Sequence, residues 1–273
     1  MRALLVVNPR ARRGRQLGAS VREHLAHLGI ETIEDGSLAD FDAIVVAGGD
    51  GTFSREIPRA LALEVPIGLV PLGTFNDLAR TLAIPLGVEG ACSVIAAGKT
   101  RAIDVARVNR ADYVTEASIG LSSRITRLQK PADKQRYGLL AIAASVFPAL
   151  WHARPFTAEI VFDGKLERLK AMQVTVASSP RFGGFITVGD AAIDDGLLDC
   201  YAVEIEGLGQ FLSVAAAVLS GRRQPGQGLR IFRSAAFEVK TRRPRRVTAD
   251  GEPAATTPAR FEVLPRALRV FVP

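Results

Sequence analysis

The stretch that decides the fold is residues 43–52, which read AIVVAGGDGT. Its first five residues form a continuous apolar run, and such a run is typical of a strand buried on both faces of a parallel sheet. Three glycines, one acid and one hydroxyl follow at once: Gly48, Gly49, Asp50, Gly51 and Thr52. Helical spacing of apolar residues then predicts a helix over 53–63. This strand, turn and helix form the unit from which α/β sheets are built.

Similar units flank this stretch on both sides. Apolar runs predict strands over 3–8, 31–33, 42–47 and 67–70, and helical spacing predicts helices over 15–28 and 77–82. After residue 104 strand patterns dominate, over 102–108, 113–119, 157–162, 172–178, 197–203, 235–239 and 268–272, with helices expected over 136–152 and 208–220. We therefore predict an α/β domain over 1–106 and a mainly β domain over 107–273, whose last strand can pack back on the first domain.

Composition limits the class of protein. The chain has 273 residues, 48% of them hydrophobic and 23% charged, so general disorder is excluded. Cys92 and Cys200 both lie in apolar stretches, which suits a reducing compartment without a disulfide framework or thiolate zinc site. The longest nearly uncharged stretches, 138–151 and 208–219, are shorter than the roughly 18 residues that cross a bilayer. We expect a soluble, cytoplasmic protein.

The net charge of +7 requires a hypothesis about partners. Arginines gather in two clusters: Arg10, Arg12, Arg13 and Arg15, and Arg242, Arg243, Arg245 and Arg246. Such clusters suit nucleic acid, phosphorylated ligands or an anionic membrane surface, or they form a solvated face without a partner. Full contact of the second cluster with an anionic bilayer would contribute about 4 kcal/mol, which supports transient visits only.

Two loops suit phosphate. In the first, glycines let the backbone approach phosphate oxygens, the following helix offers free N–H donors, and Asp50 can hold Mg²⁺. The second is residues 71–80, PLGTFNDLAR, which also follows a strand and should open on the same sheet edge. There Thr74 can bond phosphate, and Asn76 and Asp77 can hold metal or water. The alternatives are an ordinary tight turn in the first loop and an ordinary N-cap in the second.

Two acidic turns come later in the chain. Residues 194–199, DDGLLD, carry three carboxylates that either hold a cation or form a solvated hairpin. Residues 250–252, DGE, form a lone acidic turn inside a basic tail, and on spacing alone such a turn is more often structural than catalytic.

In this order the pieces resemble the diacylglycerol kinase catalytic-domain family, the bacterial lipid kinases in particular. The matching residues are 8–9, 48–52, 71–80, 101–104, 182–184, 195–199 and 250–252. They run over nearly the whole chain. Their combination is specific, although the GGDGT loop alone is shared with NAD kinases and is similar in phosphofructokinases.

The resemblance implies a Rossmann-like N-terminal domain, a β-sandwich C-terminal domain, and ATP in the cleft between them. It implies that Glu252 accepts the proton of the acceptor hydroxyl, and that Asp50, Asp77 and Asp104 belong to a network that holds catalytic Mg²⁺. A structural Mg²⁺ is expected at the turn of Ala192, Asp195 and Leu197. The residues expected around the nucleotide are Asn8, Gly48, Gly49, Asp50, Gly51, Thr52, Thr74 and Asn76.

The expected activity is therefore transfer of the γ-phosphate of ATP to a lipid hydroxyl, such as that of diacylglycerol. We expect transient contact with an anionic membrane surface at the inner membrane face and no nucleic acid partner; a homodimer stays open. Residues 137–151 are unusually apolar and either line an acyl groove, touch the membrane or form a core helix.

The chain departs from the family pattern at three places. Ser54 and Arg55 stand where the family usually has an Asn-Glu pair, Ala11-Arg12 replaces a Ser-Gly pair, and the segment 33–42 is short. One rival interpretation is an NAD kinase, which the GGDGT loop and the two-domain pattern favour. Another is a non-catalytic lipid- or nucleotide-binding protein, which Ser54 and Arg55 make conceivable.

Overall fold

The computed structural model describes residues 1–8, 14–34, 40–120, 154–182, 186–187, 191–204 and 228–273. The helices expected over 136–152 and 208–220 and the arginines at positions 10, 12 and 13 lie outside these ranges. Among the helices that are described, none is both long and apolar enough to cross a membrane.

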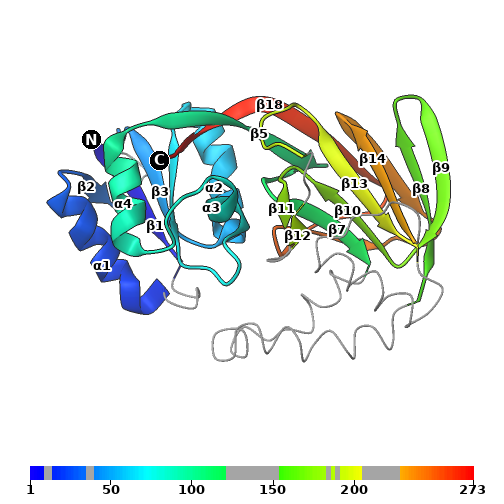
Figure 1. Cartoon of the computed structure of the whole chain (residues 1–273), viewed down its shortest axis with the longest axis horizontal. Helices are drawn as coiled ribbons and strands as arrows, with labels where there is room; N and C mark the ends of the chain where they lie inside the picture. The colour runs from blue at the N-terminus through cyan, green and yellow to red at the C-terminus, as the bar shows by residue number, and fades with distance from the viewer. Residues whose placement is uncertain (9–13, 35–39, 121–153, 183–185, 188–190, 205–227) are drawn as a thin grey trace.

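The first domain is a parallel sheet with strand order β2-β1-β3-β4 and helices on both sides (Figure 1). Its strands are β1 (Arg2–Val7), β2 (Glu31–Ile33), β3 (Ala43–Gly48) and β4 (Ile67–Pro71). Its helices are α1 (Gly14–His27), α2 (Asp50–Leu63), α3 (Asp77–Thr81) and α4 (Val88–Ala97). The residues 43–47 are fully buried, as expected for a central strand covered on both faces.

Two helices differ from the prediction. Helix α2 begins at Asp50, three residues earlier than expected. Gly49 is its N-cap, and the residues of the glycine-rich loop that follow Gly49 are already helical. Helix α4 was not predicted; it lies between Gly87 and Gly98, and Gly98 ends it in the left-handed conformation with φ 73°. Short side chains over 88–97 leave little periodicity for a sequence pattern to show.

The second domain is a sandwich of two sheets, which confirms the predicted fold class. One sheet contains β5 (Thr100–Val108), β6 (Ala111–Tyr113), β8 (Phe156–Phe162), β9 (Lys165–Ala171), β15 (Ala236–Thr241) and β18 (Ala259–Phe271). The other contains β7 (Glu116–Gly120), β10 (Gln173–Ala177), β13 (Leu198–Val203), β14 (Leu229–Ser234), β16 (Arg246–Ala249) and β17 (Glu252–Thr256). Buried side chains from both sheets form one core, including Phe237 and Phe261 from the first sheet and Ile119 and Val174 from the second. A short hairpin pairs β11 (Arg181–Phe182) with β12 (Ile186–Thr187).

Two long strands, β5 and β18, run from one domain to the other (Figure 1). They pair antiparallel, and their register shifts between Leu264 and Leu268. The end of β18 pairs with β4 through Val270 and Ile67, so the last strand completes the sheet of the first domain. The predicted boundary after residue 106 falls inside β5, which runs past it as one strand.

Candidate active site

The two phosphate-suited loops meet at one edge of the first sheet. Strands β3 and β4 are parallel neighbours with Gly48 opposite Pro71, and the Leu72 N–H donates to the Gly48 carbonyl at 2.8 Å. A Cβ atom on Gly49 would lie 3.1 Å from the Cα atom of Gly73, and one on Gly73 would lie 2.7 Å from the Cα atom of Gly49. Glycine at both positions is therefore what lets the loops touch.

Asp50 joins these loops through its carboxylate. Its two oxygens accept the N–H groups of Asp77 and Leu78, each at 3.1 Å, and so cap the start of α3. Asp50 is partly open to solvent, whereas Asp77 is buried. The pKa of Asp50 is raised to about 7, mainly by burial and then by the charges of Asp250 and Asp77, against the opposing effect of the two N–H groups.

The other residues expected around the nucleotide lie on the same edge. The Asn8 Nδ2 donates to the Thr52 Oγ1 at 2.7 Å, which joins the end of β1 to the first turn of α2. Asn76 has φ 54° and its Oδ1 accepts the Gly73 N–H at 2.9 Å, so it shapes the second loop. Thr74 lies partly exposed in that loop.

The acidic turn near the C-terminus is the tip of the β16–β17 hairpin. Ala249 pairs with Glu252, which leaves Asp250 and Gly251 as the two loop residues, with φ 46° and 79°. Positive φ at both loop residues is characteristic of a type I′ turn, which favours Asp-Gly. The turn is therefore structural, and it also carries Glu252 at its end.

Asp250 anchors this hairpin, a role that the sequence did not reveal. Its carboxylate accepts the N–H groups of Val114, Thr115 and Glu116 at 2.9, 3.1 and 3.0 Å, and also the Thr115 hydroxyl. The Ser54 Oγ of α2 donates to the same carboxylate at 2.5 Å. Asp250 thus fixes the hairpin both to residues 114–116, where β7 begins, and to α2.

Glu252 lies against the first turn of α2. A Cβ atom on Gly51 would lie 2.8 Å from the Asp250 carbonyl oxygen, 3.2 Å from the Glu252 Cγ and 3.7 Å from the Glu252 Oε1. The Arg55 Nη2, one helical turn after Gly51, lies 2.7 Å from the Glu252 Oε1. The distant acidic turn and the two loops therefore converge on one place.

A further carboxyl group, Glu116, belongs to this cluster and was missed. It is the first residue of β7 and is partly buried. Its pKa is raised to about 8, mainly by burial and then by the charges of Asp250, Asp77 and Asp50. The signal in the sequence was a lone acid inside the predicted strand 113–119. With four carboxyl groups close together, the site favours a cation.

The residues present fit a magnesium ion that arrives with a nucleotide. Mg²⁺ in nucleotide sites is commonly held by one or two carboxylates together with phosphate oxygens, and Asp50 and Asp77 can provide the carboxylates. Within the described part of the chain, no group of three or more histidine, cysteine or acidic residues is arranged to hold a metal without such help.

Asp104 lies beside the turn of Ala192, Asp195 and Leu197, where a structural Mg²⁺ was predicted. Its carboxylate is almost completely buried and accepts the Gly196 N–H at 2.6 Å and the Arg266 N–H at 2.7 Å. Arg266, with φ 47°, is at the register shift of β18. Asp104, on β5, therefore fixes both the turn that includes Gly196 and the irregular part of β18 at Arg266.

The turn at Ala192, Asp195 and Leu197 fits a structural Mg²⁺ poorly. The Asp195 carboxylate contacts the Arg233 guanidinium and accepts the N–H groups of Leu197 at 3.0 Å and Ala192 at 3.3 Å. A guanidinium thus neutralises the carboxylate that was predicted to bind the ion.

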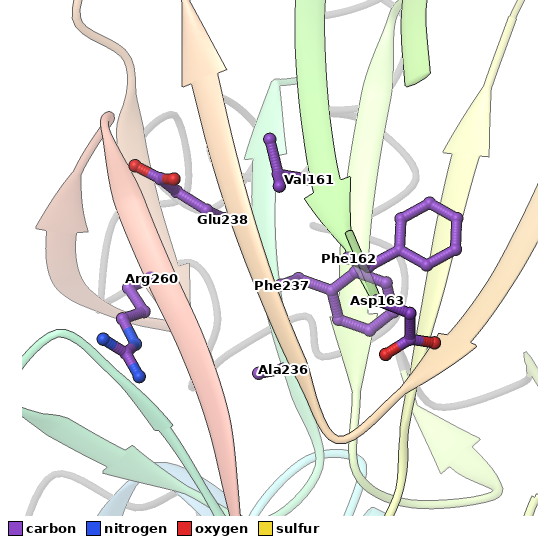
Figure 2. Close-up of a pocket in the computed structure, with 7 residues that line it drawn as sticks. All are labelled: Val161, Phe162, Asp163, Ala236, Phe237, Glu238 and Arg260. Carbon is purple, nitrogen blue, oxygen red and sulfur yellow. The ribbon is translucent and has the colours of Figure 1, made fainter. Parts of the chain in front are cut away.

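A separate cavity of about 360 Å³ lies in the second domain, on β8, β15 and β18. Figure 2 shows Glu238 and Arg260 at one end and the rings of Phe162 and Phe237 at the other. Its lining contains none of the predicted site residues, so it is not the place where the loops converge.

Comparisons with known proteins agree with this geometry. Residues 2–108 match the diacylglycerol kinase catalytic domain, and residues 115–272 match the YegS C-terminal NAD kinase beta sandwich-like domain. A diacylglycerol kinase of Bacillus subtilis is 29% identical over 244 residues, which cover 88% of this chain and 80% of that protein. A diacylglycerol kinase of Staphylococcus aureus is 26% identical over 239 residues, covering 86% and 75%.

An uncharacterized protein of Synechocystis is 28% identical over 239 residues, and the chain spans only about half of it, 54%. Two crystal structures from Bacillus anthracis share the fold over 100% of this chain. One has a TM-score of 0.82 at 24% identity, and the match covers 95% of its chain. The other, of a diacylglycerol kinase, has a TM-score of 0.74 at 22% identity and is covered to 97%. The chain therefore belongs to the diacylglycerol kinase family, with a catalytic domain of that family followed by a YegS-type β-sandwich domain.

Proposed function

We propose that this chain is a Mg²⁺- and ATP-dependent kinase that transfers the γ-phosphate of ATP to the hydroxyl group of a membrane lipid such as diacylglycerol. The observation that carries the proposal is the position of Glu252 against Gly51, beside the two glycine loops. Family membership supports a lipid as the acceptor, because the relatives from Bacillus subtilis and Staphylococcus aureus are named diacylglycerol kinases.

The nucleotide would bind where the two loops meet. The N-terminus of α2 attracts phosphate oxygens, and the glycines allow them close approach. Thr52 belongs to the first turn of this helix and accepts a hydrogen bond from Asn8, and Thr74 adds a hydroxyl from the second loop. Mg²⁺, bound with ATP near Asp50 and Asp77, would neutralise charge on the phosphate oxygens.

Glu252 would act on the acceptor. Its carboxylate takes the proton of the lipid hydroxyl while that oxygen forms a bond to the γ-phosphorus. The bond from the γ-phosphorus to the bridging oxygen breaks, and ADP leaves with the electron pair. A positioned base typically contributes about 10²- to 10⁴-fold to the rate of such a step.

We also propose transient contact with the anionic inner face of the membrane. In the loop between β15 and β16, Arg242 and Arg243 are exposed, as is Arg246 at the start of β16, while the Arg245 guanidinium lies over the Phe156 ring at 4.1 Å. Sedimentation with anionic vesicles should fall when Arg242 and Arg243 are replaced by glutamate, and neutral vesicles should sediment neither protein. Equal binding of the variant and the parent to anionic vesicles would reject this surface.

The experiment that tests the activity uses γ-labelled ATP, Mg²⁺ and the pure protein. In parallel reactions the protein receives a total lipid extract, NAD or no acceptor, and the products are separated by chloroform extraction and chromatography. We expect label in a chloroform-soluble product only. Label in NADP would support the NAD kinase alternative, and ATP binding without any labelled product would support a non-catalytic binding protein.

A further inference from the structure

Arg55 stands beside the proposed catalytic base. Residues 51 and 55 are one helical turn apart on α2, so their side chains share one face of the helix. Glu252 lies on this face: its Cγ would be 3.2 Å from a Cβ on Gly51, and its Oε1 lies 2.7 Å from the Arg55 Nη2. The Arg55 and Glu252 side chains are 58% and 52% exposed, so both are accessible from solvent.

Among the described residues, several carboxyl groups gather close to this pair. Asp250 and Asp77 lie close enough to Asp50 to raise its pKa, and together with Asp50 they also raise the pKa of Glu116, so these four carboxyl groups form one cluster. An acceptor with a negative head group would be repelled from such a cluster unless a cation were present at its entrance. Arg55 is a cation in contact with Glu252 itself.

The guanidinium suits phosphate in particular. It carries five N–H donors in a planar fork, and the contact with Glu252 involves only one of its nitrogens, Nη2. An acceptor hydroxyl must come within about 3 Å of the Glu252 carboxylate to lose its proton. Because Arg55 contacts the same carboxylate, a phosphate a few bonds from that hydroxyl falls within reach of the guanidinium.

Building on the proposed lipid kinase activity, we propose that Arg55 is a specificity-determining residue that selects an acceptor lipid whose hydroxyl-bearing head group also carries a phosphate. Neutral diacylglycerol lacks this group and is the poorer substrate. A charge-assisted hydrogen bond between guanidinium and phosphate corresponds to a preference of about tenfold to a hundredfold.

The test compares Arg55→Gln with a matched control, Arg59→Gln. Arg59 lies one turn further along α2 and pairs with Glu56 at 3.6 Å, so its removal takes the same charge from the same helix without touching Glu252. The kcat/KM for phosphatidylglycerol and for diacylglycerol with the same acyl chains is measured in micelles of an uncharged detergent, with γ-labelled ATP.

We expect the parent and Arg59→Gln to prefer phosphatidylglycerol at least tenfold, and Arg55→Gln to lose most of that ratio. If Arg55 only orients Glu252, both substrates become slower in parallel and the ratio stays unchanged, which overturns the proposal. A parent protein that prefers diacylglycerol overturns it too. If the parent phosphorylates no lipid at all, the kinase function itself fails.

A binding measurement distinguishes failure of the role proposed for Arg55 from failure of the proposed kinase activity. Calorimetric titration with water-soluble short-chain phosphatidylglycerol requires no turnover, and the affinity should drop about tenfold or more in Arg55→Gln but not in Arg59→Gln. Equal affinities of the parent and Arg55→Gln would reject the role of Arg55, even if catalysis is observed.

Discussion

Replacement of Gly51 by alanine should move the acidic turn away from α2. The new Cβ atom would lie 2.8 Å from the Asp250 carbonyl oxygen, whereas ordinary contacts begin at 3.4 Å. The difference is about 0.6 Å, and the nearest atom is backbone, so the turn itself has to shift and takes Glu252 with it. Because a misplacement of about 1 Å can cost on the order of 10²-fold in rate, we expect kcat to fall about tenfold or more.

The matched control is Gly87→Ala. A Cβ atom on Gly87 meets nothing within 4 Å, and its backbone has negative φ, so lipid phosphorylation should stay close to that of the parent. Steady-state kinetics with labelled ATP measure kcat for both variants, and calorimetry measures their affinity for ATP.

A double-mutant cycle with Glu252→Gln separates displacement of the base from damage to the nucleotide loop. If Gly51→Ala acts by moving Glu252, it should cost little in the background that already lacks this carboxylate. An equal loss of kcat in both backgrounds would refute this reasoning.

Three further predictions concern the charged groups. Asp50→Ala should abolish Mg²⁺-dependent ATP binding in calorimetry; unchanged binding would contradict a role of this carboxylate in holding the ion. Because the pKa values of Asp50 and Glu116, about 7 and about 8, lie above their values of 3.8 and 4.5 in the unfolded chain, the unfolded chain releases protons that the folded protein keeps. The free energy of unfolding without nucleotide should therefore fall with rising pH, from about 4 to about 7 through Asp50 and from about 4.5 to about 8 through Glu116. In urea unfolding, Glu116→Gln should make this decline shallower; a slope equal to that of the parent would speak against the carboxyl cluster. Arg233→Gln should lower the free energy of unfolding by about 1 kcal/mol, because Asp195 loses its counter-ion, whereas a chelator should leave the unfolding temperature of the nucleotide-free parent unchanged; marked destabilisation of the parent by the chelator would show that the turn holds a metal after all.

The local features of the first domain could be predicted from the sequence because neighbouring residues determine them. The apolar run 43–47 and the glycines after it define a buried strand and a tight turn, and the second loop repeats this pattern after β4. Their meeting at one sheet edge follows from the parallel arrangement of the strands. Helix α4 and most of β18 escaped detection, the latter because exposed charged residues such as Arg260 and Arg266 interrupt its apolar pattern.

Glu252 and Gly51 are about two hundred residues apart in the sequence, and the spacing of apolar residues cannot predict a contact between such distant residues. The family resemblance predicted it, and only the fold gives its cause, the anchoring of Asp250 by the N–H groups of Val114, Thr115 and Glu116. The contacts of Ser54 and Arg55 with the hairpin were equally hidden, since the sequence showed only that these residues depart from the family pattern.

The most direct test of the account is the rate at which Glu252→Gln transfers labelled phosphate from ATP into lipid, measured at saturating ATP beside the parent protein. We predict a rate lower by about 10²-fold or more, with ATP affinity within a few-fold of that of the parent, because the variant keeps both glycine loops and loses only the proton acceptor. A variant that phosphorylates lipid as fast as the parent would contradict the proposed convergence of the two loops and the acidic turn on one catalytic site.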